Sequence, residues 1–170
     1  MKNRKGIAYL TTVAILAVST FAHAAPQAGK SKGDNDPDLV EIRQYRLSMD
    51  KVEKAATATQ EFYQLVASDP TLKAQVDAED NDKSISDKVK TYETKFPQGV
   101  AILHKNGLAT REYIVVCLAM LNDIMIVGMK KQGTIKDYPA NAISAENATF
   151  VEANYDKLNE IAQKMTPPNN

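Results

Sequence analysis

Residues that support cofactor binding and disulfide chemistry are scarce in this sequence. It contains one cysteine, two histidines and no tryptophan in 170 residues. A single cysteine cannot form a disulfide within the chain, and the Cys-x-x-Cys-His motif of covalent haem is missing. A zinc site needs three or four converging ligands, which Cys117 and His104 cannot supply without carboxylates. We therefore expect no cofactor and no metal, and a fold that is stabilised by packing.

Motifs of nucleophilic catalysis and phosphate binding are missing as well. The sequence has no Gly-x-Ser-x-Gly turn and no glycine-rich phosphate loop. We assign no catalytic residue, although chemistry based on Asp, Glu or Tyr side chains stays open. The tripeptide Asn147-Ala148-Thr149 fits an N-glycosylation pattern, but so short a pattern often occurs by chance and receives little weight.

The acidic run at residues 77–82 does not match the calcium-binding loop of an EF-hand. With Asp80 at the first position of the loop, Ile85 stands where glycine is needed and Thr91 stands where glutamate is needed. We therefore interpret the run as a solvated acidic loop.

The first 24 residues have the parts of a secretory signal peptide. Basic residues precede an apolar run over residues 7–21, and Ala22-His23-Ala24 supplies the small-x-small pattern that signal peptidase accepts. The apolar run is shorter than the roughly 20 residues that span a bilayer. We predict cleavage before Ala25 and export of a soluble, unanchored protein to the bacterial periplasm or to the outside of the cell.

Cleavage changes the charge of the chain. Residues 1–24 contain three of the 21 basic residues and none of the 21 acidic ones, so 18 basic and 21 acidic residues remain, with a net charge of about −3. Nonspecific nucleic-acid binding depends on a basic patch that neutralises phosphates. We therefore expect no nucleic-acid partner.

Apolar residues at helical spacing predict an all-α domain, a compact bundle of four main helices and one short helix. The polar residues 25–38 predict a disordered lead-in, the domain occupies residues 39–166, and residues 167–170 form a tail. Residues 39–47 show neither a helical nor a strand period, which favours an extended segment.

Five helices are expected in chain order. The first is about 49–68, capped by Ser48, and a short one covers 71–78. The third is capped by Ser84 or Ser86, has a kink or a helix-to-helix break at Pro97 and ends at Gly107. The fourth is about 111–131, capped by Thr110, and the last follows a cap at Ser144 and ends before Pro167.

The expected helix 111–131 is the most apolar part of the mature chain, and its wide apolar arc predicts contacts with several other helices. About 16 apolar residues, interrupted by Asn122 and Asp123, fall short of the roughly 20 that cross a bilayer, so no membrane span is expected. Cys117 lies within the apolar arc and suits a buried small hydrophobic residue.

Asp123 is the first candidate for a ligand-binding residue. It lies in the middle of this helix among large apolar residues, and no partner is available on its own helix. An unpaired buried charge is costly, so the carboxylate must reach solvent or meet a donor from another element. Arg43 and Arg46 are the candidate partners by topology. Asp123 is then either a structural residue or a ligand-facing residue in a cleft.

Gly128 is the second candidate, because a glycine inside a helix costs roughly 1 kcal/mol relative to alanine. A helix packed closely against it, with the face that carries Ala55 and Ala56 as one possibility, would explain the glycine. A small pocket for an apolar ligand is the alternative, since the cores of helical bundles house such sites.

Together these observations favour an exported, non-enzymatic interaction or binding module of the bacterial cell envelope, monomeric or weakly dimeric, with an unknown protein partner. The expectation rests on fold-level analogy. The alternative is a bundle that binds a small apolar ligand near Asp123 and Gly128, with Cys117, Arg43 and Arg46 as further candidate contacts. An enzyme is the third possibility.

Overall fold

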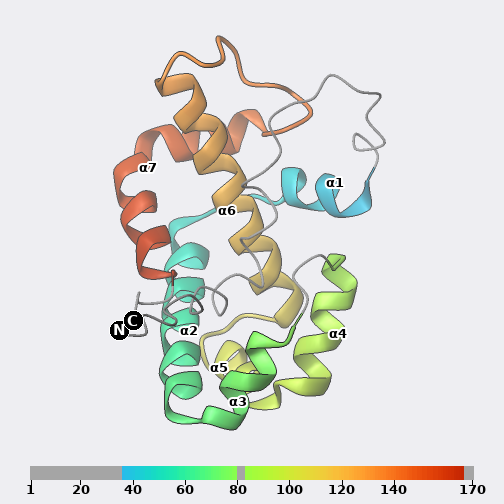
Figure 1. Cartoon of the computed structure of the whole chain (residues 1–170). Coiled ribbons are helices and arrows are strands. Elements are labelled where there is room, and N and C mark those ends of the chain that lie inside the picture. Colours follow the sequence, from blue (N-terminus) through green and yellow to red (C-terminus); the bar gives the residue numbers. More distant parts are fainter. Residues whose placement is uncertain (1–35, 80–82, 167–170) are drawn as a thin grey trace, which may run out of the picture.

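The computed structural model describes residues 36–79 and 83–166, which contain seven helices and no strand (Figure 1). The all-α prediction is confirmed. The predicted signal peptide, residues 25–35 of the predicted lead-in and the predicted tail lie outside the described residues. The helices are α1 Pro37–Gln44, α2 Met49–Ser68, α3 Pro70–Asp77, α4 Ile85–Lys95, α5 Pro97–Lys105, α6 Thr110–Lys131 and α7 Ala145–Lys164.

Within the described residues, seven helices take the place of the expected four main helices and one short helix. One reason is Pro97, which begins α5, because proline lacks the backbone N–H of a continuing helix and its ring clashes with the preceding turn. Phe96, between α4 and α5, has a φ of −125° and a ψ of 56°, which is outside the helical region. The predicted break is therefore a complete boundary between two helices.

Helix α1 corrects the extended segment predicted for residues 39–47. The Asp36 carboxylate accepts a hydrogen bond from the Asp38 backbone N–H at 2.9 Å, and Pro37 occupies the first helical position, where proline is favoured. Only one of the eight residues of α1 is buried, so its apolar pattern is too weak to predict a helix. The Asp38 carboxylate also accepts a hydrogen bond from the Ile85 backbone N–H at 2.8 Å, which ties α1 to the beginning of α4.

The expected caps hold for two of the three long helices. Ser48 caps α2 and Ser144 caps α7, each through its side-chain oxygen. The prediction for Thr110 is wrong, because Thr110 is the first residue of α6 and is buried, while Ala109 takes the N-cap position without a side-chain hydrogen bond. Burial of the Thr110 side chain in the core outweighs its capping preference.

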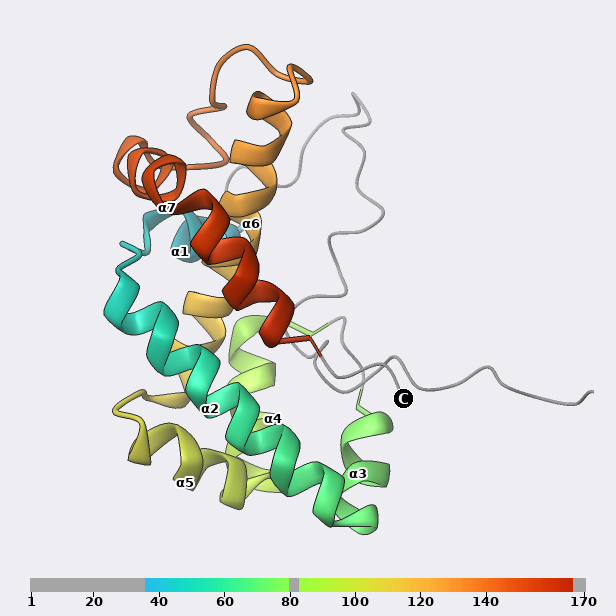
Figure 2. The ribbon, with the colours of Figure 1, turned by 90° about the vertical axis from the view of Figure 1, so that its left-hand side faces the viewer.

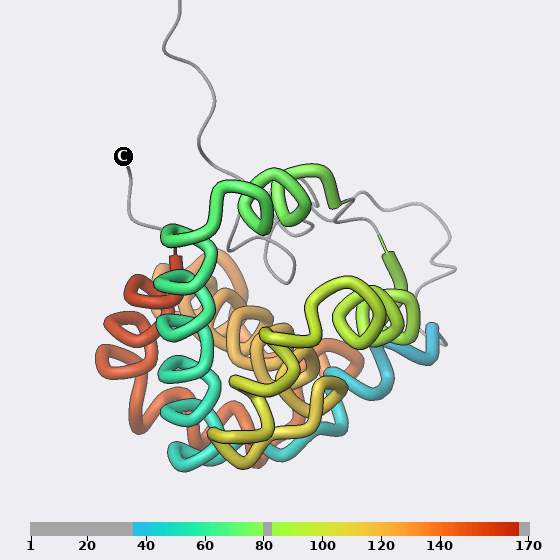
Figure 3. The backbone as a smooth tube through the Cα atoms, turned by 90° about the horizontal axis from the view of Figure 1, so that it is seen from below, coloured from blue at the N-terminus to red at the C-terminus, as the bar shows by residue number. Residues whose placement is uncertain are grey.

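Helix α6 is the centre of the fold. Figure 1 shows it between α7 and α1, and the view from below in Figure 3 shows it enclosed by α2, α4, α5 and α7. Val116, Ala119 and Val127 of α6 have no exposed surface. Because their neighbours come from several helices, burial of α6 holds the whole domain together.

By length and composition alone α6 could cross a membrane, but 67% of its most apolar window is buried inside the fold. Such burial is typical of a core helix. In this structure most of the apolar residues of α6 are used in packing.

Helix α7 bends at Asn154, which has a φ of −122° and a ψ of 17°. As a result its first half crosses the upper part of α6, and its second half runs beside α2 (Figure 2). An ion pair between Lys157 Nζ and Glu53 Oε1 at 2.6 Å joins this second half to α2. The bend lets one helix cover two neighbours.

Aromatic rings fill the lower core. Tyr92 lies with its ring centroid 6.2 Å from Phe62, 5.8 Å from Phe96 and 6.3 Å from Tyr113. A Cβ atom at Gly99 would lie 2.9 Å from the Phe62 ring, so only glycine allows α5 to approach α2 this closely. Asn122 and Asp123 lie in the other half of α6.

Candidate functional site

Asp123 is fully buried, and its carboxylate is held by two neutral amides. Asn122 Nδ2 donates to Oδ1 at 3.0 Å, and Asn147 Nδ2 of α7 donates to Oδ2 at 2.8 Å. We call Asp123, Asn122 and Asn147 the amide–carboxylate network. Each carboxylate oxygen therefore has a donor, but none of these donors carries a positive charge.

The two asparagines connect the carboxylate to segments between helices. Asn147 Nδ2 also donates to the Tyr45 carbonyl at 2.8 Å, and Asn147 Oδ1 accepts the Leu47 backbone N–H at 3.1 Å. Asn122 Nδ2 also donates to the Ala142 carbonyl at 2.9 Å. Through these bonds the network holds both the α1–α2 connection and the α6–α7 connection against the bundle.

Arg43 and Arg46 do not partner Asp123, so that prediction is wrong. Arg43 Nη1 donates to the Asn141 carbonyl at 2.9 Å. Arg46 Nε lies 3.4 Å from Glu146 Oε2, and their side chains are 80% and 66% exposed. A guanidinium group would lose its hydration on entering the core, whereas a short asparagine amide reaches the carboxylate at a lower desolvation cost.

Burial raises the pKa of Asp123 from its ordinary 3.8 to about 6, while the hydrogen bonds from Asn122 and Asn147 act in the opposite direction. Desolvation is the larger effect because the two donors are neutral. The carboxyl group is half protonated close to pH 6.

Gly128 lies against Tyr155 of α7. A Cβ atom at Gly128 would be 2.6 Å from the Tyr155 hydroxyl oxygen, which real Cβ atoms essentially never approach. Lys131 Nζ lies 4.5 Å from the centroid of the same tyrosine ring. The close partner of Gly128 is thus Tyr155 rather than the Ala55 and Ala56 face of α2, and the tyrosine hydroxyl occupies the space beside the glycine.

Cys117 is buried in the core, 2% exposed. Burial raises the pKa of its thiol to about 12, and a hydrogen bond from Tyr113 only partly opposes that shift. The thiol is therefore protonated at neutral pH and is a poor nucleophile. Cys117 lies six positions before Asp123, roughly 9 Å along the helix axis.

Of the candidate residues from the sequence, only Asp123 belongs to the amide–carboxylate network. Asn147 was missed as a partner, although it carries a detectable signal: it lies four residues before Val151, on the apolar stripe of α7, where a polar side chain requires a partner. Both N–H groups of the Asn147 amide are already bonded within the fold. Its burial speaks against the glycosylation pattern noted in the sequence.

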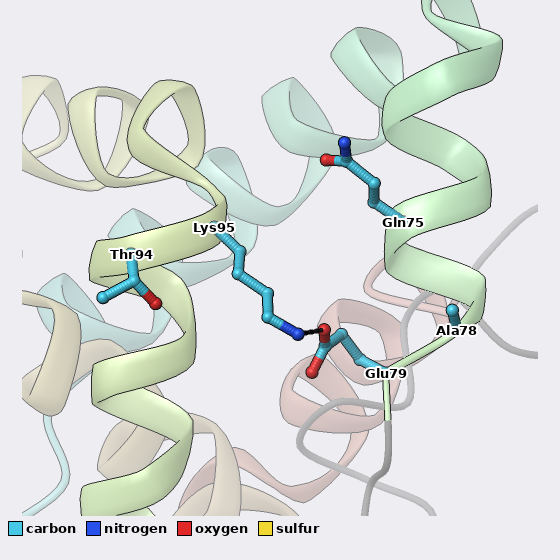
Figure 4. Close-up of a pocket in the computed structure, with 5 residues that line it drawn as sticks. All are labelled: Gln75, Ala78, Glu79, Thr94 and Lys95. Atoms are coloured by element: carbon cyan, nitrogen blue, oxygen red, sulfur yellow. Dashed lines mark hydrogen bonds and ion pairs between the residues drawn. The ribbon is translucent and has the colours of Figure 1, made fainter.

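A pocket of about 470 Å³ lies between the ends of α3 and α4 (Figure 4). It is lined by Gln75, Ala78, Glu79, Thr94 and Lys95. The buried Glu79 carboxylate forms an ion pair with Lys95 across the pocket. Figure 4 shows the Lys95 and Glu79 side chains meeting between the two helices.

Glu79 also accepts a hydrogen bond from Lys83 Nζ at 2.7 Å. The hydrogen bonds from Lys83 and Lys95 lower the pKa of Glu79. The interpretation of residues 77–82 as a wholly solvated loop is therefore wrong at Glu79, whose side chain is 5% exposed. Its role is to join α3 to α4.

No cluster of three or more His, Cys, Asp or Glu side chains that could hold a metal ion occurs in residues 36–79 and 83–166. Comparison of the chain with protein-family models, with curated proteins and with solved structures found no match.

Proposed function

We propose that this protein is an exported, non-enzymatic interaction module of the bacterial cell envelope. The observation that carries the proposal is the exposure of Met125, which is 41% exposed although it lies on the core helix α6. Among the large hydrophobic side chains of the described residues, only Leu39 is also exposed. An exposed apolar side chain on the central helix is a feature that packing within the domain does not require.

Leu121, Met125 and Met129 occur at intervals of four residues and so share one side of α6. We call them the Met125 row. Leu121 and Met129 are partly exposed, which extends the apolar surface along one face of the helix. Methionine has a flexible and polarisable side chain that adapts to different partners, and contiguous exposed apolar surface is typical of protein interaction sites.

The structure around Gly128 favours this proposal over an apolar-ligand pocket. An apolar ligand at that position would need the space that the Tyr155 hydroxyl occupies. Asp123, the other residue of that alternative site, has both carboxylate oxygens bonded within the fold. Both residues therefore serve the packing of α6 against α7.

Export is tested by the mass of the protein recovered outside the cytoplasm of its own host. Cleavage as predicted gives a chain that begins at Ala25. Recovery of the uncleaved chain in the cytoplasm would contradict export.

The interaction role is tested by site-specific photo-crosslinking in cells. A photoreactive phenylalanine analogue at Met125 is compared with the same analogue at Glu160, an exposed position on α7. We expect a discrete crosslinked protein with the probe at Met125 and none with the probe at Glu160. Equal crosslinking from both positions, or none from either, would contradict a binding surface on the Met125 row.

A further inference from the structure

In the amide–carboxylate network, two chain segments, the α1–α2 connection and the α6–α7 connection, are both held through one ionisable group, the Asp123 carboxylate. The two N–H groups of Asn147 go to Asp123 and to the Tyr45 carbonyl, and those of Asn122 go to Asp123 and to the Ala142 carbonyl. Each asparagine is oriented by its bond to the carboxylate. Separation of the network therefore releases the α1–α2 and α6–α7 connections together.

The charged groups on the elements around Asp123 either have other partners or are exposed. On α1, Arg43 donates to a backbone carbonyl of the α6–α7 connection, and Arg46 of the α1–α2 connection is paired with Glu146 at the beginning of α7. In the α6–α7 connection, Lys136 and Asp137 are exposed.

On α6 itself, the nearest charged side chains towards the N-terminus and the C-terminus are Glu112 and Lys130. Glu112 accepts a hydrogen bond from the Tyr45 hydroxyl at 3.2 Å and pairs with Lys51 at 2.8 Å. Lys130 pairs with Glu152 of α7 at 3.3 Å. An ionised Asp123 thus stays in the core without a cation of its own.

We infer that the amide–carboxylate network is a pH-sensitive latch, which acid closes and which holds the α1–α2 connection and the α6–α7 connection against α6 and α7. In the closed latch Asp123 is desolvated and prefers to be neutral. In the open latch the carboxyl group is solvated and has its ordinary pKa of 3.8, against about 6 when closed. The closed state therefore binds the proton more tightly, and acid favours closure.

The size of the pH effect on closing, and the pH range over which it acts, follow from the difference between the two pKa values of Asp123. Between pH 6 and pH 4 the equilibrium constant for closing rises about fivefold for each pH unit of acidification, because somewhat less than one proton is taken up on closure over this range. Above about pH 7 the carboxylate is ionised in both states, and the equilibrium no longer depends on its titration. The latch is weakest at neutral pH and tightens in acid surroundings.

Hydrogen exchange at the Leu47 backbone N–H reads the latch directly, because this group donates to Asn147 Oδ1 at 3.1 Å. The exchange rate of this amide in the mature chain is measured by NMR between pH 4.5 and pH 6.5. The protection factor is the intrinsic exchange rate at each pH divided by the measured exchange rate. We expect the protection factor of Leu47 to rise about 14-fold from pH 6 to pH 4.5. A protection factor that stays constant over this range would overturn the latch.

The backbone N–H of Val116, which is fully buried in the middle of α6, reports global unfolding. We expect Leu47 to be at least tenfold less protected than Val116, since the latch opens without unfolding of the core. Equal protection of the two amides would show that the connections detach only when the whole domain unfolds, and the latch would be refuted.

The substitution Asp123→Asn removes the titrating group while keeping its shape. In this variant we expect the protection of Leu47 to lose its dependence on pH, and an unchanged dependence would overturn the proposal. If the variant does not fold, the carbon-13 shift of the Asp123 carboxyl group in the wild-type chain is titrated instead. A midpoint close to pH 6 supports the latch, and a midpoint close to pH 4 contradicts it.

Discussion

Asn147 Nδ2 of α7 donates a hydrogen bond to the buried carboxylate of Asp123 on α6, 2.8 Å away and 24 residues earlier in the chain. The same asparagine bonds the Tyr45 carbonyl and the Leu47 N–H. One short polar side chain thus joins three parts of the chain that lie far apart in sequence. This relationship assigns Asp123 a structural role and leads to the first two predictions.

The substitution Asn147→Ala should lower the free energy of unfolding by about 3 kcal/mol, because it leaves a buried carboxylate oxygen and two backbone groups without their partners. Urea denaturation measures the loss. Asn159→Ala is the matched control, since the Asn159 amide donates only to the Tyr155 carbonyl of its own helix. We expect a loss below about 1 kcal/mol there. Equal losses in the two variants would argue against the network.

The raised pKa of Asp123 makes the stability of the domain depend on pH in a defined direction. Because the folded state binds the proton more tightly than the unfolded state, the stabilisation is complete below pH 3.8 and is lost as the pH rises through 6. The wild-type chain should lose about 2 kcal/mol relative to Asp123→Asn between pH 4 and pH 7. Urea denaturation of both proteins at pH 4 and pH 7 measures this, and a constant difference would contradict the buried, unpaired carboxyl group.

The contact between Gly128 and Tyr155 predicts that alanine is destabilising at a helix position where it is ordinarily favoured. Gly128→Ala should cost about 1 kcal/mol, since the clash with the hydroxyl exceeds the gain in helix propensity. In a chain that carries Tyr155→Phe the hydroxyl is gone, and the same alanine substitution should become stabilising. Thermal unfolding of the wild-type chain, the two single variants and the double variant gives the coupling energy between positions 128 and 155. Additive effects would show that the tyrosine moves aside without cost.

Glu79 should contribute more to the free energy of unfolding than an exposed glutamate does. Glu79→Gln leaves Lys83 and Lys95 without their shared carboxylate, and we expect a loss of about 2 kcal/mol in unfolding free energy, discounted because both lysines reach solvent. Glu53→Gln is the control, as its pair with Lys157 is more than half exposed on both sides. Because the pKa of Glu79 is lowered, its contribution is present above its ordinary pKa and is lost in stronger acid.

The long helices could be predicted from the sequence because local signals agree there. In α2 and α7 a serine cap precedes a 20-residue helix, and in α6 two lysines in the last turn precede a glycine with positive φ. Helix α1 escaped prediction because it has eight residues and a single buried one. Besides its local cap at Asp36 and Pro37, it contacts α6 and accepts a hydrogen bond from the Ile85 N–H of α4, and these long-range contacts are contained in no local pattern.

The sequence singles out Asp123 as an unusual position, but it does not indicate which residues partner the carboxylate. A carboxylate in an apolar helix signals the need for a donor, yet the donor can come from any element that the fold brings near. The charge of Arg43 and Arg46 made them attractive partners, whereas distance and desolvation select Asn147. Similarly, the glycine at 128 signals a close contact without naming Tyr155.

The most direct test of the proposed interaction role is native mass spectrometry of the mature protein purified from its own host, with wild-type and Met125→Lys chains in parallel. We expect the wild-type chain to carry a partner protein of the envelope, and the variant to lose it while its melting temperature is unchanged, since Met125 faces solvent. A wild-type chain that is recovered only as a monomer, or that carries a bound apolar small molecule in place of a protein, would contradict the account.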